Sequence, residues 1–365
     1  MPAQPTHQFL LDDASGRLLG PLRYESASYS LAANATGTLN LTLAYGTGAD
    51  IQAGQIVEVW RSPASGMALI PVDEFIITAV KSSITPSGAR FYSITANDLV
   101  WVLGGYANRY ANTTWVGAAD DYMRLVFRGN LLADGPGDGS TDAAVKRRAV
   151  SFAIPMTCEA NQSAGPGVKI TSPTGQLLSV MQSVAKKAMY PDGYPGIAGR
   201  PLFFDLYASA RNPLGFTFAV FCDQRGRDLT KNNPVVLSTT AELPQVEVEE
   251  DYASEVNAVF YTAGSLKRVK ADTARSLRSP FARRESSAGE TIDAVAALRD
   301  GLPGWSVRGS LVNTDNCVFG RDYWWGDAVL VAVGGLTYPM RLDAVSISVN
   351  ADGAETRGAR FNLIR

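Results

Sequence analysis

The chain has 365 residues, of which 46% are hydrophobic and 19% are charged, so it contains ample apolar material for packed cores. This length corresponds to two or three ordinary domains or to one large all-β assembly. The 33 lysines and arginines nearly balance the 35 aspartates and glutamates, which excludes a globally basic nucleic-acid-binding protein.

Histidine and cysteine are scarce, which limits the chemistry of the chain. The single histidine, His7, lies among the first residues, which are usually poorly ordered in proteins. Serine-histidine-aspartate triads, cysteine-histidine dyads and multi-histidine metal sites are therefore close to excluded. Cys158, Cys222 and Cys317 form no Cys-x-x-Cys pair, which excludes a structural zinc site. We expect three buried thiols that behave as small apolar side chains, with one disulfide as the alternative.

Nothing in the sequence indicates insertion into a membrane. The N-terminal residues MPAQPTHQF have neither the basic region nor the apolar run of a signal peptide. No apolar stretch approaches the roughly 18–20 residues that a membrane span needs. We therefore expect no stable membrane insertion.

The first hundred residues have the pattern of β-strands. Apolar and polar residues alternate in short runs at 28–43, 55–62, 74–83 and 89–98, and Gly, Pro, Asn or Asp bound each run. Short strands without intervening helices imply a closed barrel or a sandwich. The glycine-rich segment 99–110 marks the exit from it.

Two helices are predicted in the middle of the chain. In 115–132 apolar residues recur with helical spacing, and Asp120 and Asp121 lie near the start, where the helix dipole favours acidic groups. In 172–193 the apolar residues again share one face, and a proline and a glycine end the helix. The segment between them, 133–145, is the most loop-like stretch of the chain.

The remainder returns to β structure. Two apolar runs at 201–209 and 215–223 predict a hairpin, and 245–264 alternates as one or two strands. Residues 265–285 are basic and irregular, and 291–302 predicts a short amphipathic helix. The last sixty residues are rich in strand patterns, and one Asp-Gly turn between alternating runs is typical of a β-hairpin.

Adjacent carboxylates are the first candidates for catalysis. Pairs occur at Asp12 and Asp13 and at Asp120 and Asp121, and a triplet occurs at 249–251. Adjacent residues do not face each other on a helix or a strand, so sequence gives no sign of the facing pair that a glycosidase uses. We interpret these acids as solvated surface charge.

The glycine-rich loop is the candidate site for an ion. Asp134, Asp138 and Asp142 lack the alternating spacing and the final glutamate of an EF-hand, so calcium is the minor alternative to a plain surface loop. The run GPGDGS at 135–140 lacks the Lys-Ser/Thr ending of a phosphate-binding loop. We therefore predict no catalytic residue, no cofactor and no metal ligand.

A basic segment and an aromatic triplet are candidates for protein contacts. Residues 265–285 contain seven lysines and arginines against two acids, and only Phe281 is aromatic, so stacking on single-stranded nucleic acid is poorly supported. Tyr323, Trp324 and Trp325 cannot all point one way on a strand, so one face is predicted core and the other an interface anchor. The predicted inter-subunit contact residues are Arg268, Arg278, Arg283, Arg284, Glu249, Glu250 and Trp324.

The segment 321–361 resembles the closing segment of phage tail-tip hub proteins, a baseplate family. That family ends with an Asp-Tyr-x-x-Gly-Asp-x-Val strand, a strand carrying arginine, a valine-rich strand, an Asp-Gly turn and a last strand. The matching residues here are Asp322, Tyr323, Gly326, Asp327, Val329, Arg341, Val345, Asp352 and Gly353. The start of the chain looks like the first hub barrel, and 255–264 looks like the strand that begins the second. The resemblance covers nearly the whole chain in order.

The resemblance implies a mainly β fold with α+β insertions. Two similar antiparallel β-barrels are expected at 1–108 and 240–365, with inserted helix and hairpin regions at 109–239 and a loop and helix excursion at 265–305. It also implies a structural virion protein without catalytic residues. Three copies would form a hub ring at the distal end of the tail tube, assembled in the host cytoplasm, with DNA only in transit through its lumen.

The partners implied by the resemblance are other copies of the chain, the distal ring protein of the tail tube, the tape-measure protein, and tail-tip or fibre proteins. Two functions of other classes stay open: a cell-wall-degrading enzyme, and a carbohydrate- or receptor-binding tail-tip protein. An enzyme would lose turnover when an aspartate or glutamate in its cleft is replaced. A binder would hold a sugar as a monomer, whereas a hub would assemble without either property.

Overall fold

The computed structural model describes residues 5–44, 50–132, 154–189, 199–251, 257–271, 285–288 and 304–364, apart from Ser65, Thr85, Ser87, Ala89, Ala111, Asn112, Asn212 and Gly264. The predicted loop 133–145, with its three aspartates, and the predicted helix 291–302 lie outside the described residues.

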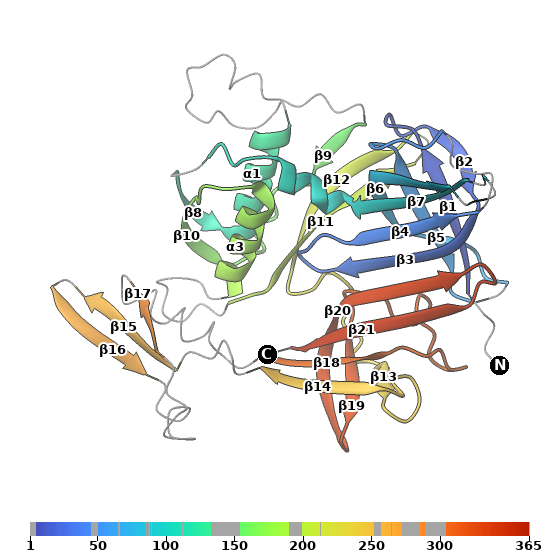
Figure 1. Ribbon diagram of the computed structural model, residues 1–365. Coiled ribbons are helices and arrows are strands. Elements are labelled where there is room, and N and C mark those ends of the chain that lie inside the picture. The colour runs from blue at the N-terminus through green and yellow to red at the C-terminus, as the bar shows by residue number, and fades with distance from the viewer. Residues whose placement is uncertain are drawn as a thin grey trace, which may run out of the picture.

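One large sheet contains strands from both ends of the chain (Figure 1). Its N-terminal strands are β1 (Thr6–Asp12), β2 (Leu18–Leu22), β3 (Tyr24–Ala32), β4 (Thr38–Leu43), β5 (Ile56–Ser62), β6 (Ile70–Ile84) and β7 (Arg90–Asp98). Its C-terminal strands are β13 (Val236–Ser238), β14 (Val246–Asp251), β18 (Gly304–Ser310), β19 (Ala328–Val333), β20 (Leu336–Asn350) and β21 (Glu355–Leu363).

The two sets of strands join through antiparallel pairing of β3 with β20. The strand order is β14-β18-β21-β20-β3-β4-β7-β6-β5-β1-β2, and β19 pairs with both β20 and β13. The predicted hairpin at the end of the chain is confirmed as β20–β21, and Gly353 takes the positive φ of +81° that its tight turn requires. A single sheet therefore connects the first and last hundred residues.

Alternating burial explains why these residues form strands. On β4, Leu39, Leu41 and Leu43 are buried, while Thr38 and Asn40 between and before them are exposed. The leucines join one apolar core that also contains residues of β5, β19, β20 and β21. A strand that buries one face has apolar and polar residues in alternation, which is the period of two seen in the sequence.

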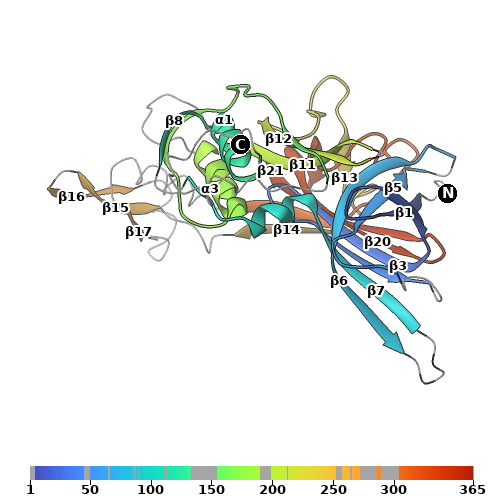
Figure 2. The same ribbon diagram turned by 90° about the horizontal axis from the view of Figure 1, so that it is seen from above.

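The long hairpin of β6 and β7 projects beyond the rest of the sheet (Figure 2). Residues 81–84 at its end are exposed, and the Ile84 side chain keeps 61% of its surface in solvent.

The inserted region between β7 and β13 packs helices on two small sheets (Figure 1). Its elements are the 3-10 helix η1 (Leu99–Gly105), β8 (Thr114–Ala118), α1 (Ala119–Leu131), β9 (Met156–Cys158), β10 (Gly167–Thr171), α3 (Leu177–Met189), β11 (Leu202–Ala210) and β12 (Gly215–Cys222). The two helices predicted in 115–132 and 172–193 and the predicted β11–β12 hairpin are confirmed, although α1 begins only at Ala119, because the residues before it pair with β10 as β8. α3 begins later than the sequence indicated. The Asn108 amide nitrogen donates to Ser172 Oγ and to the Pro173 carbonyl, and the Ser172 N–H donates to the Thr113 carbonyl, so these residues are held outside the helix.

A further, separate sheet contains β15 (Ala258–Ala263), β16 (Leu266–Ala271) and β17 (Glu285–Ala288), in the order β16-β15-β17. The interpretation of 265–285 as irregular is therefore wrong for residues 266–271. The alternation of apolar and polar residues in 266–271 is unclear from the sequence alone, and the strand forms because it pairs antiparallel with β15.

The expectation of a mainly β fold with small α+β insertions is confirmed. The pairings among the described strands form an open path from β14 to β2 and do not close a ring. Closure into two barrels stays a prediction.

Candidate functional site

The predicted contact residues are spread over different elements. Glu249 lies on β14, where its Oε2 is 2.9 Å from Arg308 Nη2, and Arg268 lies exposed on β16. Trp324 is half-buried, and its ring stacks on Phe319 with centroids 4.5 Å apart. Glu250 belongs to β14, but its side chain, like the residues Arg278, Arg283 and Arg284, lies outside the described part of the chain. Glu249, Arg268 and Trp324 belong to three different segments of the described chain, and the inter-subunit role of the whole set stays a prediction.

A buried charged cluster connects the two ends of the large sheet. Arg61 on β5 donates from Nε and Nη2 to the two carboxylate oxygens of Glu355 on β21, at 2.8 and 2.9 Å, and from Nη1 to the Phe319 carbonyl at 2.9 Å. Both charged side chains are fully buried, and Arg357 Nε lies 3.0 Å from the same carboxylate. Such bidentate pairs are strong and directional, so this cluster fixes the two halves against each other.

His7 completes the cluster, opposite Arg61 on the paired strand β1. Its Nε2 lies 3.2 Å from Glu355 Oε2 and 3.1 Å from the Tyr29 hydroxyl. Burial, aided by Arg61 and Arg357 and opposed by Glu355, lowers the pKa of His7 from 6.5 to about 4. The ring is therefore neutral at pH 7. Its Nε2 makes both of these contacts, so the ring acts in the cluster as a neutral hydrogen-bonding group.

We expect His7 to make the protein sensitive to acid. In the unfolded chain this histidine binds a proton below about pH 6.5, whereas in the folded chain it stays neutral down to about pH 4. The free energy of unfolding therefore falls as the pH drops from about 6.5 to about 4. Between pH 7 and pH 4 the wild type should lose about 3 kcal/mol more than His7→Gln. Urea unfolding at both pH values measures this difference, and equal losses for the two proteins would contradict it.

A second charged contact holds the inserted region on the N-terminal strands. Arg211, directly after β11, donates to Glu58 on β5 and to Glu74 on β6, and its guanidinium lies 4.9 Å from the centre of the Trp60 ring. Asn34, in the turn between β3 and β4, bonds the backbone of β11 with both ends of its amide, at 2.8 and 3.0 Å. Side chains of the large sheet and of the inserted region therefore hold the two in contact through ion pairs and hydrogen bonds.

Asp12 lies beside Glu58 at this contact and is only 1% exposed, so the interpretation of this acid as solvated surface charge is wrong. Burial, followed by the neighbouring charge of Glu58, raises the pKa of Asp12 from 3.8 to about 7. The folded chain therefore keeps a proton on Asp12 between about pH 4 and pH 7 that the unfolded chain has lost. Stability from this group is present at low pH and is lost as the pH rises through about 7.

We expect Asp12→Asn to remove that loss, because the amide cannot ionise. Between pH 4.5 and pH 8, the unfolding free energy of the variant relative to that of the wild type should rise by about 2–4 kcal/mol. Urea unfolding at the two pH values measures this change. Asp13→Asn is the control, since hydrogen bonds from Ser15 and Arg17 lower the pKa of the partly exposed Asp13 to about 2. Parallel pH profiles for Asp12→Asn and the wild type would refute the expectation.

The acidic pair Asp120 and Asp121 is not solvated surface charge, contrary to the sequence interpretation. Both residues are buried at the start of α1, where Asp120 Oδ2 is 2.6 Å from Arg124 Nη1. The two carboxylates also accept the backbone N–H groups of residues 162–165, at 2.8–3.2 Å. Burial opposes ionisation, but the bonds from Gly165 and Arg124 outweigh it and lower the pKa of Asp120. The pair therefore anchors the loop that precedes β10 to the start of α1.

The three thiols are free and stay protonated at neutral pH. Cys317 is buried, and burial followed by the charge of Glu242 raises its pKa to about 12. Cys158 and Cys222 are half-buried, and burial raises the pKa of both. A thiol acts as a nucleophile only as the thiolate, so none of them has the setting of a reactive cysteine.

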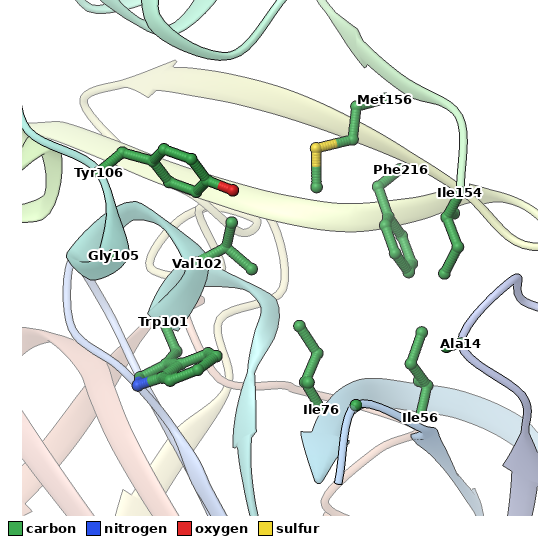
Figure 3. A pocket seen from close by; sticks show the side chains of 11 residues that line it. Ala14, Ile56, Ile76, Trp101, Val102, Gly105, Tyr106, Ile154, Met156 and Phe216 are labelled. Carbon is green, nitrogen blue, oxygen red and sulfur yellow. The ribbon is translucent and has the colours of Figure 1, made fainter. Parts of the chain in front are cut away.

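An apolar cavity of about 400 Å³ lies between the large sheet and the inserted region (Figure 3). Its lining residues are Ala14, Gly54, Ile56, Ile76, Trp101, Val102, Gly105, Tyr106, Ile154, Met156 and Phe216. Ile56, Ile76, Val102 and Phe216 point toward one another around it (Figure 3). The lining is mostly apolar and includes no charged side chain, so the cavity can hold an apolar group.

Within the described ranges, no group of three or more histidine, cysteine, aspartate or glutamate side chains is placed to hold a metal ion. None of the helices in those ranges is both long and apolar enough to cross a membrane.

The sequence contained one signal for the buried cluster. Arg61 shares a strand face with Val57 and Val59, and Glu355 and Arg357 share one with Ala359 and Phe361. A charged residue at a position with the parity of the core indicates a buried partner. Residue spacing alone did not identify which partner.

No protein-family model matches the chain, and no curated protein matches it in sequence. Solved structures of other proteins do match it in fold. The tail protein from Neisseria meningitidis MC58 shares 12% identity at a TM-score of 0.56, over 98% of this chain and 96% of its own. The 43 kDa tail protein of prophage MuSo2 from Shewanella oneidensis shares 11% identity at 0.58, over 99% and 97%.

The prophage tail protein gp18 from Listeria monocytogenes EGD-e shares 10% identity at a TM-score of 0.51, over 97% of this chain and 94% of its own. In all three the likeness extends through the sheet and the insertions and is not limited to one module. It agrees with the resemblance drawn from the sequence. The chain therefore has the fold of phage and prophage tail proteins.

Proposed function

We propose that the chain is a structural protein of a phage or phage-like tail, and that three copies form a hub at the distal end of the tail tube. The observation that carries the proposal is the shared fold over nearly the whole length of three tail proteins. The buried charges support a structural role, because Arg61, Glu355 and Arg211 bind one part of the chain to another. These contacts stabilise a framework and do not form a reaction site.

The hub would contact further copies of itself, the distal ring protein of the tail tube, the tape-measure protein, and tail-tip or fibre proteins. It would line the path by which DNA leaves the particle, with DNA only in transit. It would assemble in the host cytoplasm and reside at the distal end of the tail in the virion.

We also propose three parts for the chain: a first hub barrel at 1–108, inserted regions at 109–239 and a second hub barrel at 240–365 that includes the excursion 265–305. Supporting this division, β1–β7 precede residue 108, and α1, α3 and β8–β12 fall between 109 and 239. β13, at Val236–Ser238, pairs with β19 and so associates with the C-terminal strands.

Antibody labelling of intact particles tests the proposed location. Gold-labelled antibodies against the chain should decorate one end of the tail, opposite the capsid, in electron micrographs. Particles that lack the chain are the control and should carry no label. Label along the whole tail, or none on intact particles, would refute a distal hub. Hydrolysis of cell walls or binding to a glycan array by the purified chain would favour the alternatives instead.

A further inference from the structure

Two strands of the chain are sheet edges in the part that the structure describes. β14 hydrogen-bonds to β18 on one side only, and β16 hydrogen-bonds to β15 on one side only. Both strands have six residues. An edge strand presents a row of unpaired N–H and C=O groups, which is a template for a strand of another chain.

The two edges carry opposite charge. β14 has the sequence VEVEED, in which Glu247 and Glu249 are exposed. β16 has the sequence LKRVKA, in which Lys267 and Arg268 are exposed. Opposite charges on facing strands attract, and like charges directly opposite each other repel. β14 and β16 therefore suit each other better than either suits a second copy of itself.

Each edge also presents an exposed apolar side chain. Val248 on β14 keeps 42% of its surface in solvent, and Val269 on β16 keeps 45%. Exposed valines on unpaired strands favour aggregation unless a partner covers them. Pairing the two strands would cover both.

One alignment satisfies charge and apolar contact together. In the antiparallel direction with Glu249 opposite Arg268, Val248 falls opposite Val269. The same register places residue 247 opposite residue 270 and residue 250 opposite residue 267, which is Glu opposite Lys in both cases. The parallel alignment that keeps Glu249 with Arg268 instead places Val248 opposite Lys267. Antiparallel pairing is the one that fits.

We propose that β14 of one copy pairs antiparallel with β16 of a second copy, with Glu249 opposite Arg268. The contact is head-to-tail, so each copy offers one edge to each neighbour, and three copies form a ring when successive contacts are related by a rotation of one third of a turn. Glu249 already meets Arg308 at the surface, but both side chains are half-exposed, so that pair is weak and leaves the carboxylate accessible. This interface deepens the proposed hub and rests on its homotrimeric state.

Disulfide trapping tests the register. Val248→Cys and Val269→Cys in one chain would place thiols on directly opposite residues, whose Cβ atoms lie about 4.5–5.5 Å apart in a paired sheet. Mild oxidation should then give covalent dimers and trimers on a non-reducing gel. The control combines Val248→Cys with Leu266→Cys, which replaces an exposed apolar residue of β16 on the opposite strand face, and should give none. Wild-type protein reports any background from the three natural thiols.

A charge swap tests the same pair without cysteines. Glu249→Lys and Arg268→Glu should each weaken self-association at least tenfold at low salt, and the double variant should recover most of the loss. If light scattering shows a trimer but neither trapping nor charge reversal affects it, the β14–β16 interface is overturned and the hub stands. If the chain stays monomeric at every concentration and no trapping occurs, the interface and the homotrimer both fail. Equal trapping of the control pair would also overturn the register.

Discussion

Replacing Arg61 by leucine is expected to lower the free energy of unfolding by about 3–5 kcal/mol. The variant leaves the Glu355 carboxylate fully buried without its bidentate partner and leaves the Phe319 carbonyl without its donor. An uncompensated buried charge costs far more than the loss of a surface pair. Urea or thermal unfolding followed by circular dichroism measures the change.

Arg17→Ala is the matched control for Arg61→Leu. Arg17 also pairs with a carboxylate, at 3.1 Å from Asp13, but its side chain is 75% exposed, so its removal should change stability by less than about 1 kcal/mol. The double variant Arg61→Leu with Glu355→Leu should recover part of the loss, because it removes both charges together. A loss below about 1 kcal/mol for Arg61→Leu alone would show that the cluster does not hold the two halves.

Gly129→Ala is expected to cost about 3 kcal/mol or more, although alanine usually favours helices. Gly129 lies inside α1, and a Cβ atom there would overlap the ring and hydroxyl of Tyr110, which is itself buried. An aromatic ring in a packed core has little room to move away. The melting temperature of the variant gives the size of the effect.

Gly167→Ala is the control for Gly129→Ala, because nothing lies within 4 Å of the position that its Cβ would take. It should change stability by less than about 1 kcal/mol. Combining Gly129→Ala with Tyr110→Ala should cost less than the sum of the two single changes, because the second change makes room for the first. Strict additivity would mean that the two positions do not touch.

Most strands of this fold could be predicted because burial on one face leaves an alternating pattern. Leu39, Leu41 and Leu43 show it within a single segment, and the Asp-Gly turn before Ala354 shows where β20 reverses into β21. Local chemistry of this kind needs no knowledge of the partner strand. The two helices were predictable for the same reason, from apolar residues at helical spacing.

The contacts that join distant segments could not be predicted in this way. Arg61 and Glu355 are 294 residues apart, and their pairing depends on strands that meet only in the folded sheet. Asp120 and Asp121 have the appearance of an ordinary acidic helix start, and only the backbone N–H groups of residues 162–165 make their burial favourable. β16 was missed because its charges obscure its alternation until β15 is placed beside it.

The mass of the purified chain in solution tests the proposed hub most directly. Multi-angle light scattering should give a single species of about 117 kDa, three times the 39.0 kDa of one chain, and negative-stain images of that species should show a ring with a central opening. A single species of 39.0 kDa at every concentration, with no ring in the images, would contradict a homotrimeric hub.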